Sequence, residues 1–174
     1  MHSLFKKQEK KENKFYNEIL LLSRNKALYT KLYLKDTFQN RINLIFFHFS
    51  FMLTKLKLKK FDNNYNSFYQ KTFDLIFKNI EINMRELGQG DVSVNKNMKF
   101  LVKIFYNILL NCETYSKKKL KDKNAFLCKY LVQNDNINTP YNDGLVDYFD
   151  KYESFCFDLS VDNVLKCNFK FNYK

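Results

Sequence analysis

The sequence is poor in the residues that tight turns and β-hairpins require. Its 174 residues include only three glycines and one proline, well below average usage, and hairpin turns depend on glycine and related turn residues. This scarcity favours helices. Apolar residues make up 45% of the chain, which at this length is enough for one hydrophobic core. The composition therefore predicts an all-α, single-domain, multi-helix bundle.

The sequence also lacks the usual metal-binding patterns. Its two histidines, His2 and His48, are far apart, and its four cysteines contain no C-x-x-C pair. Structural zinc sites are built from such closely spaced pairs. We therefore predict no metal and no cofactor, and we expect reduced thiols rather than disulfides. The cysteines are Cys112, Cys128, Cys156 and Cys167.

No catalytic constellation can be assembled from the residues present. His48 is the only interior histidine, and it lies in the most apolar segment of the chain. The glycine-containing segment Gly88–Asp91 follows an expected helix and lacks the Gly-Lys-Ser/Thr sequence of a phosphate-binding loop. We predict no catalytic residues and no enzymatic activity. A helical enzyme acting on an isoprenoid or a quinone is an alternative, but the absence of a D-D-x-x-D cluster counts against it.

No run of apolar residues is long enough to cross a membrane. The longest, Leu44–Leu53, has ten residues, whereas a transmembrane helix needs about 20. We expect a buried core helix there and only peripheral contact with any membrane. Residues 1–14 are rich in lysine but contain no arginine and fit a transit peptide poorly. The mature protein is expected to begin near Met1, with a basic tail at 1–14 and the helical domain at 15–174.

Positive charge is unevenly distributed. The net charge of +12 divides into +15 for residues 1–130, from 26 basic and 11 acidic residues, and −3 for residues 131–174, from 4 and 7. The basic part could lie against anionic lipid headgroups or ribosomal RNA, and a solvated lysine-rich surface is the alternative. No DNA partner is predicted.

Helical periodicity predicts three long core helices, over 38–60, 67–87 and 95–118. Asp36 or Thr37, Ser67 and Asn95 are candidate caps. Shorter helices are expected from Tyr16, from Ala125 and from Leu145, while residues 163–171 alternate weakly, which is typical of an extended segment. Arg41, His48 and Lys55 recur every seven residues and should project from nearly one face of the first core helix.

The turn after the second core helix contains two of the three glycines. Gly88 follows the last apolar position of that helix, where a left-handed residue would end it, and Gly90 follows closely. We expect a backbone that adopts positive φ or closely approaches another group. Ion pairing among Arg41, Arg85, Glu86 and Asp91 is the structural alternative. Our hypothesis is a shared polar, partner-binding site formed by Arg41, His48, Arg85, Glu86, Asp91 and Tyr106, with Gly88 and Gly90 shaping the backbone.

Four blocks of sequence occur in a distinctive order between residues 15 and 115. They are YNEILLLSR at 16–24, QNRINLIFFH at 39–48, TFDLIFKNIEINMRELGQGD at 72–91 and SVNKNMKFLVKIFYNILLNCETY at 93–115. In order and spacing these blocks resemble the ubiquinol-cytochrome c chaperone family. The chain departs from that family at Phe105-Tyr106-Asn107-Ile108, where members usually have Phe-Tyr-Gly-Arg.

The resemblance implies an assembly chaperone for the cytochrome bc1 complex, respiratory complex III, that binds newly synthesised cytochrome b. It also implies that the partners include a small co-chaperone, the ribosome or an anionic membrane surface. The expected location is the cytoplasm of a bacterium, peripheral to the inner membrane, or the matrix side of the mitochondrial inner membrane. The alternative function is a basic helical module that binds RNA or the ribosome through lysines at 96–103 and 117–123, without a cytochrome client.

Overall fold

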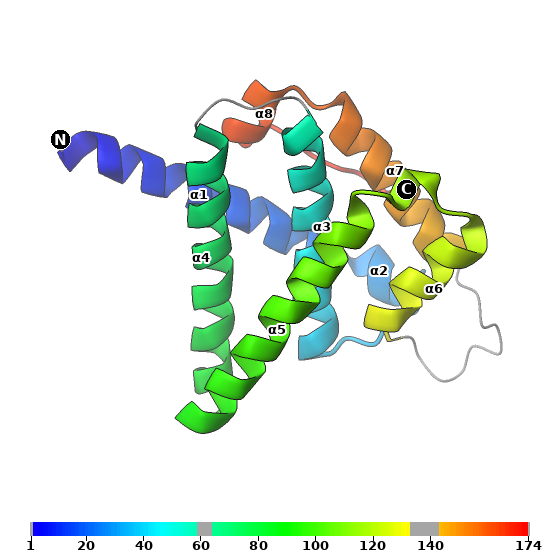
Figure 1. Ribbon diagram of the computed structural model, residues 1–174, viewed down its shortest axis with the longest axis horizontal. Helices are drawn as coiled ribbons and strands as arrows, with labels where there is room; N and C mark the ends of the chain where they lie inside the picture. Colours follow the sequence, from blue (N-terminus) through cyan, green and yellow to red (C-terminus); the bar gives the residue numbers. More distant parts are fainter. Residues whose placement is uncertain (1, 59–63, 133–142, 174) are drawn as a thin grey trace.

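The computed structural model describes residues 2–58, 64–132 and 143–173, and all regular elements of these segments are helical. The predicted all-α class is therefore confirmed. Figure 1 shows the helices as one bundle, with the N-terminal end of α1 extending beyond it. The helices are α1 (His2–Ser23), α2 (Lys26–Thr30), α3 (Phe38–Leu58), α4 (Asn64–Glu86), α5 (Asp91–Cys112), the 3₁₀ helix η1 (Tyr115–Lys117), α6 (Leu120–Tyr130), α7 (Asp143–Asp158) and α8 (Val161–Leu165).

Helix α3 is the centre of the bundle. It contacts α1, α4, α5 and α7, and all residues from 42 to 53 are buried. This follows from its sequence, because apolar residues occupy most of its circumference and a helix of that kind is stable only when surrounded. Thr37 caps the helix by accepting a hydrogen bond from the Asn40 amide (3.2 Å), as the sequence predicted.

Aromatic rings join α3 to the two helices that follow it. Phe105 of α5 packs against Phe46 and Phe49 of α3, with ring centroids 5.4 and 5.7 Å apart. Phe77 of α4 stacks on Phe46 at 5.4 Å and meets Phe105 edge to face. Offset and edge-to-face arrangements such as these are favourable for aromatic side chains. The cluster fixes α3, α4 and α5 as one unit.

The turn between α4 and α5 is short. Gly88 has φ +83°, its amide donates to Arg85 O and the Gln89 amide donates to Met84 O. These two hydrogen bonds form a Schellman motif, which ends a helix at a left-handed glycine. The prediction for Gly88 is confirmed. Gly90 instead has φ −73° and open space around its Cα, so the expectation of positive φ or close approach was wrong there.

Other helix boundaries differ from their predicted positions. Helix α5 begins at Asp91, four residues before the proposed cap Asn95, and Ser67 lies inside α4 instead of capping it. Helix α1 is longer than expected, since it already begins at His2 and includes most of the proposed tail. Predictions for 59–60, for 62–63 and for the break at 134–141 lie outside the described residues.

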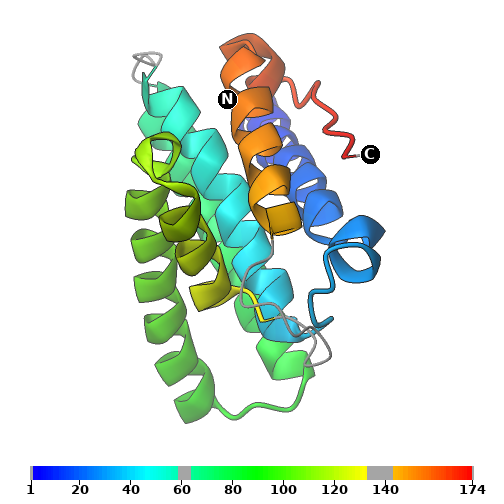
Figure 2. The ribbon, with the colours of Figure 1, turned by 90° about the vertical axis from the view of Figure 1, so that its right-hand side faces the viewer.

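The C-terminal segment follows the last helix back across the bundle. Residues 163–165 belong to α8, and the segment from 166 to 173 is irregular. Its aromatic residues pack on the core. The ring centroid of Phe169 is 5.8 Å from that of Phe15 of α1, and the ring centroid of Phe171 is 5.1 Å from that of Tyr152 of α7. Figure 2 shows this segment beside α7 and α1. The chain end thus ties the first helix to the last long one.

Candidate functional site

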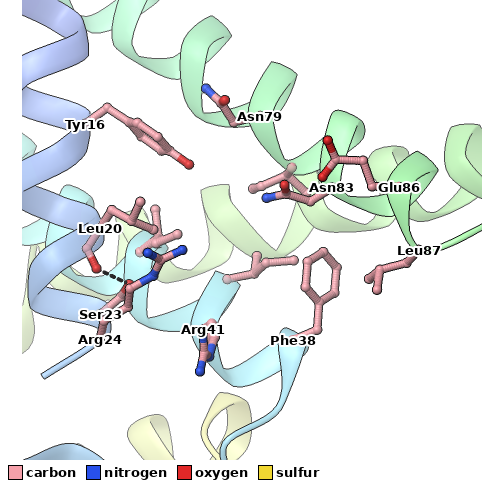
Figure 3. A pocket seen from close by; sticks show the side chains of 13 residues that line it. Tyr16, Leu20, Ser23, Arg24, Phe38, Arg41, Asn79, Asn83, Glu86 and Leu87 are labelled. Atoms are coloured by element: carbon pink, nitrogen blue, oxygen red, sulfur yellow. Dashed lines mark hydrogen bonds between the residues drawn. The ribbon is translucent and has the colours of Figure 1, made fainter. Parts of the chain in front are cut away.

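A pocket of about 460 Å³ lies between α1, α3 and α4. Figure 3 shows side chains entering it from all three helices. Apolar residues provide much of its lining and polar residues provide the rest, a combination that ligand and partner sites commonly have. It is lined by Tyr16, Leu20, Ser23, Arg24, Phe38, Arg41, Ile42, Ile45, Asn79, Ile80, Asn83, Glu86 and Leu87.

The polar groups of the pocket come mainly from α1 and α4. The Tyr16 hydroxyl and the Asn83 amide point toward the space between the two helices (Figure 3). Burial raises the pKa of Tyr16, and the nearby positive charge of Arg24 opposes this shift. Arg24 forms no ion pair with any described residue. A protonated hydroxyl from α1 and a cation from the residue that follows α1 therefore both face the pocket.

Arg41 and Glu86 lie on opposite walls of the same pocket. Arg41 of α3 holds Asp36 through two hydrogen bonds of 2.6 and 2.8 Å, and the hydrogen bond from Arg41 is the main reason that the pKa of Asp36 lies below its usual range. Glu86 is exposed near the end of α4 and pairs with no basic residue among those described. Of the proposed ion cluster, these two residues share a pocket but do not pair.

Arg85 forms an ion-paired clasp across the turn. Its guanidinium contacts Asp91, the first residue of α5. It also donates a hydrogen bond of 2.9 Å to the carboxylate of Glu81, one helical turn earlier in α4. Both carboxylates raise the pKa of Arg85, Asp91 more strongly. The structural alternative for this part of the sequence is thus confirmed for Arg85 and Asp91. Exposed pairs of this kind add little stability, so the clasp mainly orients the turn.

His48 lies in the core, away from solvent. Its Nδ1 is 2.6 Å from the carbonyl oxygen of Leu44, and its Nε2 is 2.7 Å from the Tyr148 hydroxyl. Because a carbonyl can only accept, Nδ1 carries the proton, and Nε2 accepts a hydrogen bond from Tyr148. The Tyr152 hydroxyl donates to the His48 carbonyl at 3.2 Å. His48 therefore joins α3 to α7.

The stability of the protein should fall on mild acidification because of His48. Burial lowers the pKa of this imidazole to about 4, from an unfolded value of 6.5. Since the unfolded chain binds the proton more readily, stability is lost as pH falls through the window between these values. We expect a loss of about 2 kcal/mol in unfolding free energy between pH 7 and pH 5. Urea denaturation at both pH values measures it.

The variant His48→Gln is the control for this pH dependence. Glutamine can still accept and donate hydrogen bonds but does not titrate. Its unfolding free energy should change much less between pH 7 and pH 5 than that of the unaltered protein. An equal loss in both proteins would assign the effect to other groups.

Tyr106 lies on a different face from the pocket. It is exposed on α5, where its hydroxyl accepts a hydrogen bond from the Tyr69 hydroxyl of α4 at 3.3 Å. The eight residues of the proposed partner-binding site are therefore distributed over several places. Arg41 and Glu86 line the pocket, and Gly88 lies in the turn after α4. Arg85 and Asp91 form the ion pair across this turn, which also contains Gly90. His48 lies in the core and Tyr106 on the exposed side of α5.

Sequence reasoning did not single out four polar residues of the pocket, Tyr16, Arg24, Asn79 and Asn83. Two signals could have found them. Tyr16 and Arg24 begin and end the first block that resembles the chaperone family, and Asn79 and Asn83 are four residues apart on one face of α4. Helical residues with this spacing are neighbours on the surface.

Two features of the described segments concern possible metal ligands and membrane-spanning helices. These segments contain no group of three or more histidine, cysteine, aspartate or glutamate side chains placed to hold a metal ion. The four cysteines are free, and burial raises the pKa of Cys112 and Cys156. Among the helices described, none has the length and apolar content needed to span a bilayer.

The fold and the pocket define an all-α bundle protein with a pocket lined by polar and apolar residues. The family model described as Ubiquinol-cytochrome C chaperone matches residues 30–171. The chain belongs to the ubiquinol-cytochrome c chaperone family. The resemblance noted in the sequence is thereby confirmed.

A solved structure has the same fold. The crystal structure of the Cbp3 homolog from Brucella abortus is similar with a TM-score of 0.80 and 21% sequence identity, over 98% of this chain and 96% of that chain. At this level of identity the similarity concerns the fold alone. A search of curated proteins gave no match.

Proposed function

We propose that this chain is a non-enzymatic assembly chaperone of the cytochrome bc1 complex, respiratory complex III, and that its client is newly synthesised cytochrome b. The observation that carries the proposal is the family match over residues 30–171. The expected setting is the surface of the inner membrane, with a small co-chaperone or the ribosome as further partners. A client made at a membrane has apolar helices flanked by basic residues.

The pocket between α1, α3 and α4 is the proposed contact for this client. Its apolar lining, which includes Leu20, Phe38 and Ile45, suits the side chains of an unassembled membrane helix. Glu86 at the edge suits a basic flank, whereas Arg24 suits a carboxylate or a helix C-terminus. A mixed rim of this kind would fix the orientation of a segment that the apolar lining holds.

Capture of newly made cytochrome b tests the proposal. Tagged chain, purified from cells in which cytochrome b is pulse-labelled, is expected to recover labelled cytochrome b, and a deletion strain is expected to lose most of its assembled bc1 complex. Another labelled membrane protein of similar size serves as the control for nonspecific capture. Normal assembly of the bc1 complex in the deletion strain would refute the proposal.

A further inference from the structure

Helix α5 exposes an unusual combination of side chains along its solvent side. Residues 92, 96, 99, 103, 106 and 110 follow one another at alternating steps of four and three, so they share one helical face. We call this face, together with the adjacent Phe100, the α5 outer face. It consists of Val92, Lys96, Lys99, Phe100, Lys103, Tyr106 and Leu110.

The apolar residues of the α5 outer face are strongly exposed. The exposed fractions are 85% for Val92, 60% for Phe100 and 61% for Leu110. The opposite side of the same helix is buried against the bundle through Val94, Leu101, Phe105, Ile108 and Cys112. The exposure is therefore not a consequence of poor packing. Figure 2 shows α5 at one edge of the bundle, where its outer side is uncovered.

The charge on this face has one sign. Lys96, Lys99 and Lys103 lie between the apolar residues, none of them forms an ion pair with a described residue, and the face contains no acidic residue. From Val92 to Leu110 the face is about 27 Å long at 1.5 Å per residue. Lysines beside exposed apolar side chains on one helical face are typical of helices that lie in the interfacial region of a membrane.

A lipid surface explains this face better than a nucleic acid does. RNA would pair with the three lysines through its phosphates, but its backbone offers nothing to cover Val92 and Leu110. An anionic bilayer satisfies both features, because its headgroups attract the lysines and its acyl boundary receives the apolar side chains.

We propose that the α5 outer face binds an anionic membrane surface and orients the chaperone on it. This inference rests on the membrane setting in the proposed function but not on the identity of the client. The pocket lies between α1, α3 and α4, whereas the outer face belongs to α5. Membrane binding and client binding therefore use different surfaces.

The absence of tryptophan from the chain makes a direct fluorescence test possible. The variant Phe100→Trp places a single indole on the α5 outer face, and Leu21→Trp places one at a similarly exposed position of α1, where Leu21 is 63% exposed. With vesicles containing phosphatidylglycerol, the emission of Phe100→Trp should shift to shorter wavelength and be quenched by brominated lipid. The emission of Leu21→Trp should change little.

Removal of the lysines tests the electrostatic part. The triple variant Lys96→Gln, Lys99→Gln and Lys103→Gln should lower partitioning onto these vesicles about a hundredfold at low salt, because each lysine contributes about a fivefold factor. The matched control is the triple variant Lys117→Gln, Lys119→Gln and Lys121→Gln, which removes the same charge from three exposed residues. It should lower partitioning onto the vesicles much less. Co-sedimentation measures both.

Three results would overturn the inference. They are equal losses for the two triple variants, no lipid quenching of Phe100→Trp, or unchanged vesicle binding by the 96/99/103 variant together with a loss of salt-sensitive binding to ribosomal RNA. The last would assign the face to RNA. Cytochrome b capture is measured separately in detergent, so failure of membrane binding and failure of the proposed chaperone function are distinguishable.

Discussion

The variant Phe105→Ala is expected to lower the free energy of unfolding by about 3 to 5 kcal/mol. Phe105 is fully buried, and its ring contacts Phe46 and Phe49 of α3 as well as Phe73 and Phe77 of α4. Truncation removes the apolar surface of the ring and leaves a cavity where three helices meet. The neighbouring rings cannot all collapse into one space, because each is held by its own helix.

The matched control for this variant is Phe100→Ala, on the exposed side of the same helix. It removes the same atoms from a ring that is 60% exposed, so its effect on the unfolding free energy should be within about 0.5 kcal/mol. Urea denaturation followed by circular dichroism compares the two variants. Similar losses would show that α5 contributes through its helical propensity and not through the aromatic cluster.

The variant Asn83→Trp is expected to abolish most of the capture of cytochrome b. Asn83 is exposed, and its amide points into the pocket between α1 and α4 (Figure 3). An indole at this position would occupy space that the proposed client requires. A loss of about 2 kcal/mol of binding free energy, typical for a central position of an interface, reduces affinity about thirtyfold.

Ile82→Trp provides the control for bulk on α4. Ile82 precedes Asn83, is 41% exposed and does not line the pocket. Its variant should capture cytochrome b nearly as well as the unaltered chain, and both variants should keep the circular dichroism spectrum and the unfolding free energy of the parent. If both lose capture equally, or neither does, the client does not enter this pocket.

The central position of α3 could be predicted from the sequence because the cause is local. Its apolar residues follow the helical period and also occupy the positions between the periodic ones, so only a surrounded helix could bury them. The end of α4 was predictable for a similar reason. Gly88 follows the last apolar position, and a left-handed C′ residue needs no information from elsewhere in the chain.

The start of α5 was misplaced because two local signals competed. Asn95 is a good capping residue, but Asp91 in the first turn is favoured by the positive end of the helix dipole, and its ion pair with Arg85 forms only once α4 is in place. The side chain of Asn95 is instead exposed within the helix. The first residue of α5 therefore depends on a tertiary contact with α4, which a local sequence pattern does not reveal.

The pocket could not be predicted from the sequence, because its walls come from segments about sixty residues apart. Tyr16 and Arg24 reach it only through the packing of α1 on α3 and α4. The seven-residue spacing correctly predicted a common direction for His48 and Lys55, which both contact α7. Arg41 instead pairs with Asp36 and lines the pocket. The spacing did not indicate that this direction leads into the core for His48.

Helix α1 forms one wall of the pocket and also belongs to the core, because Phe15 is fully buried and packs against Phe49 of α3 and Phe68 of α4. The family match begins at residue 30, yet Tyr16, Leu20 and Arg24 form one side of the pocket. An exchange of residues 2–29 for the corresponding segment of another member would therefore alter the pocket, and it would preserve the core only if the buried residues Phe15, Ile19 and Leu28 were retained. A chimera that retains these buried residues would test whether the proposed client preference depends on the wall that α1 contributes to the pocket.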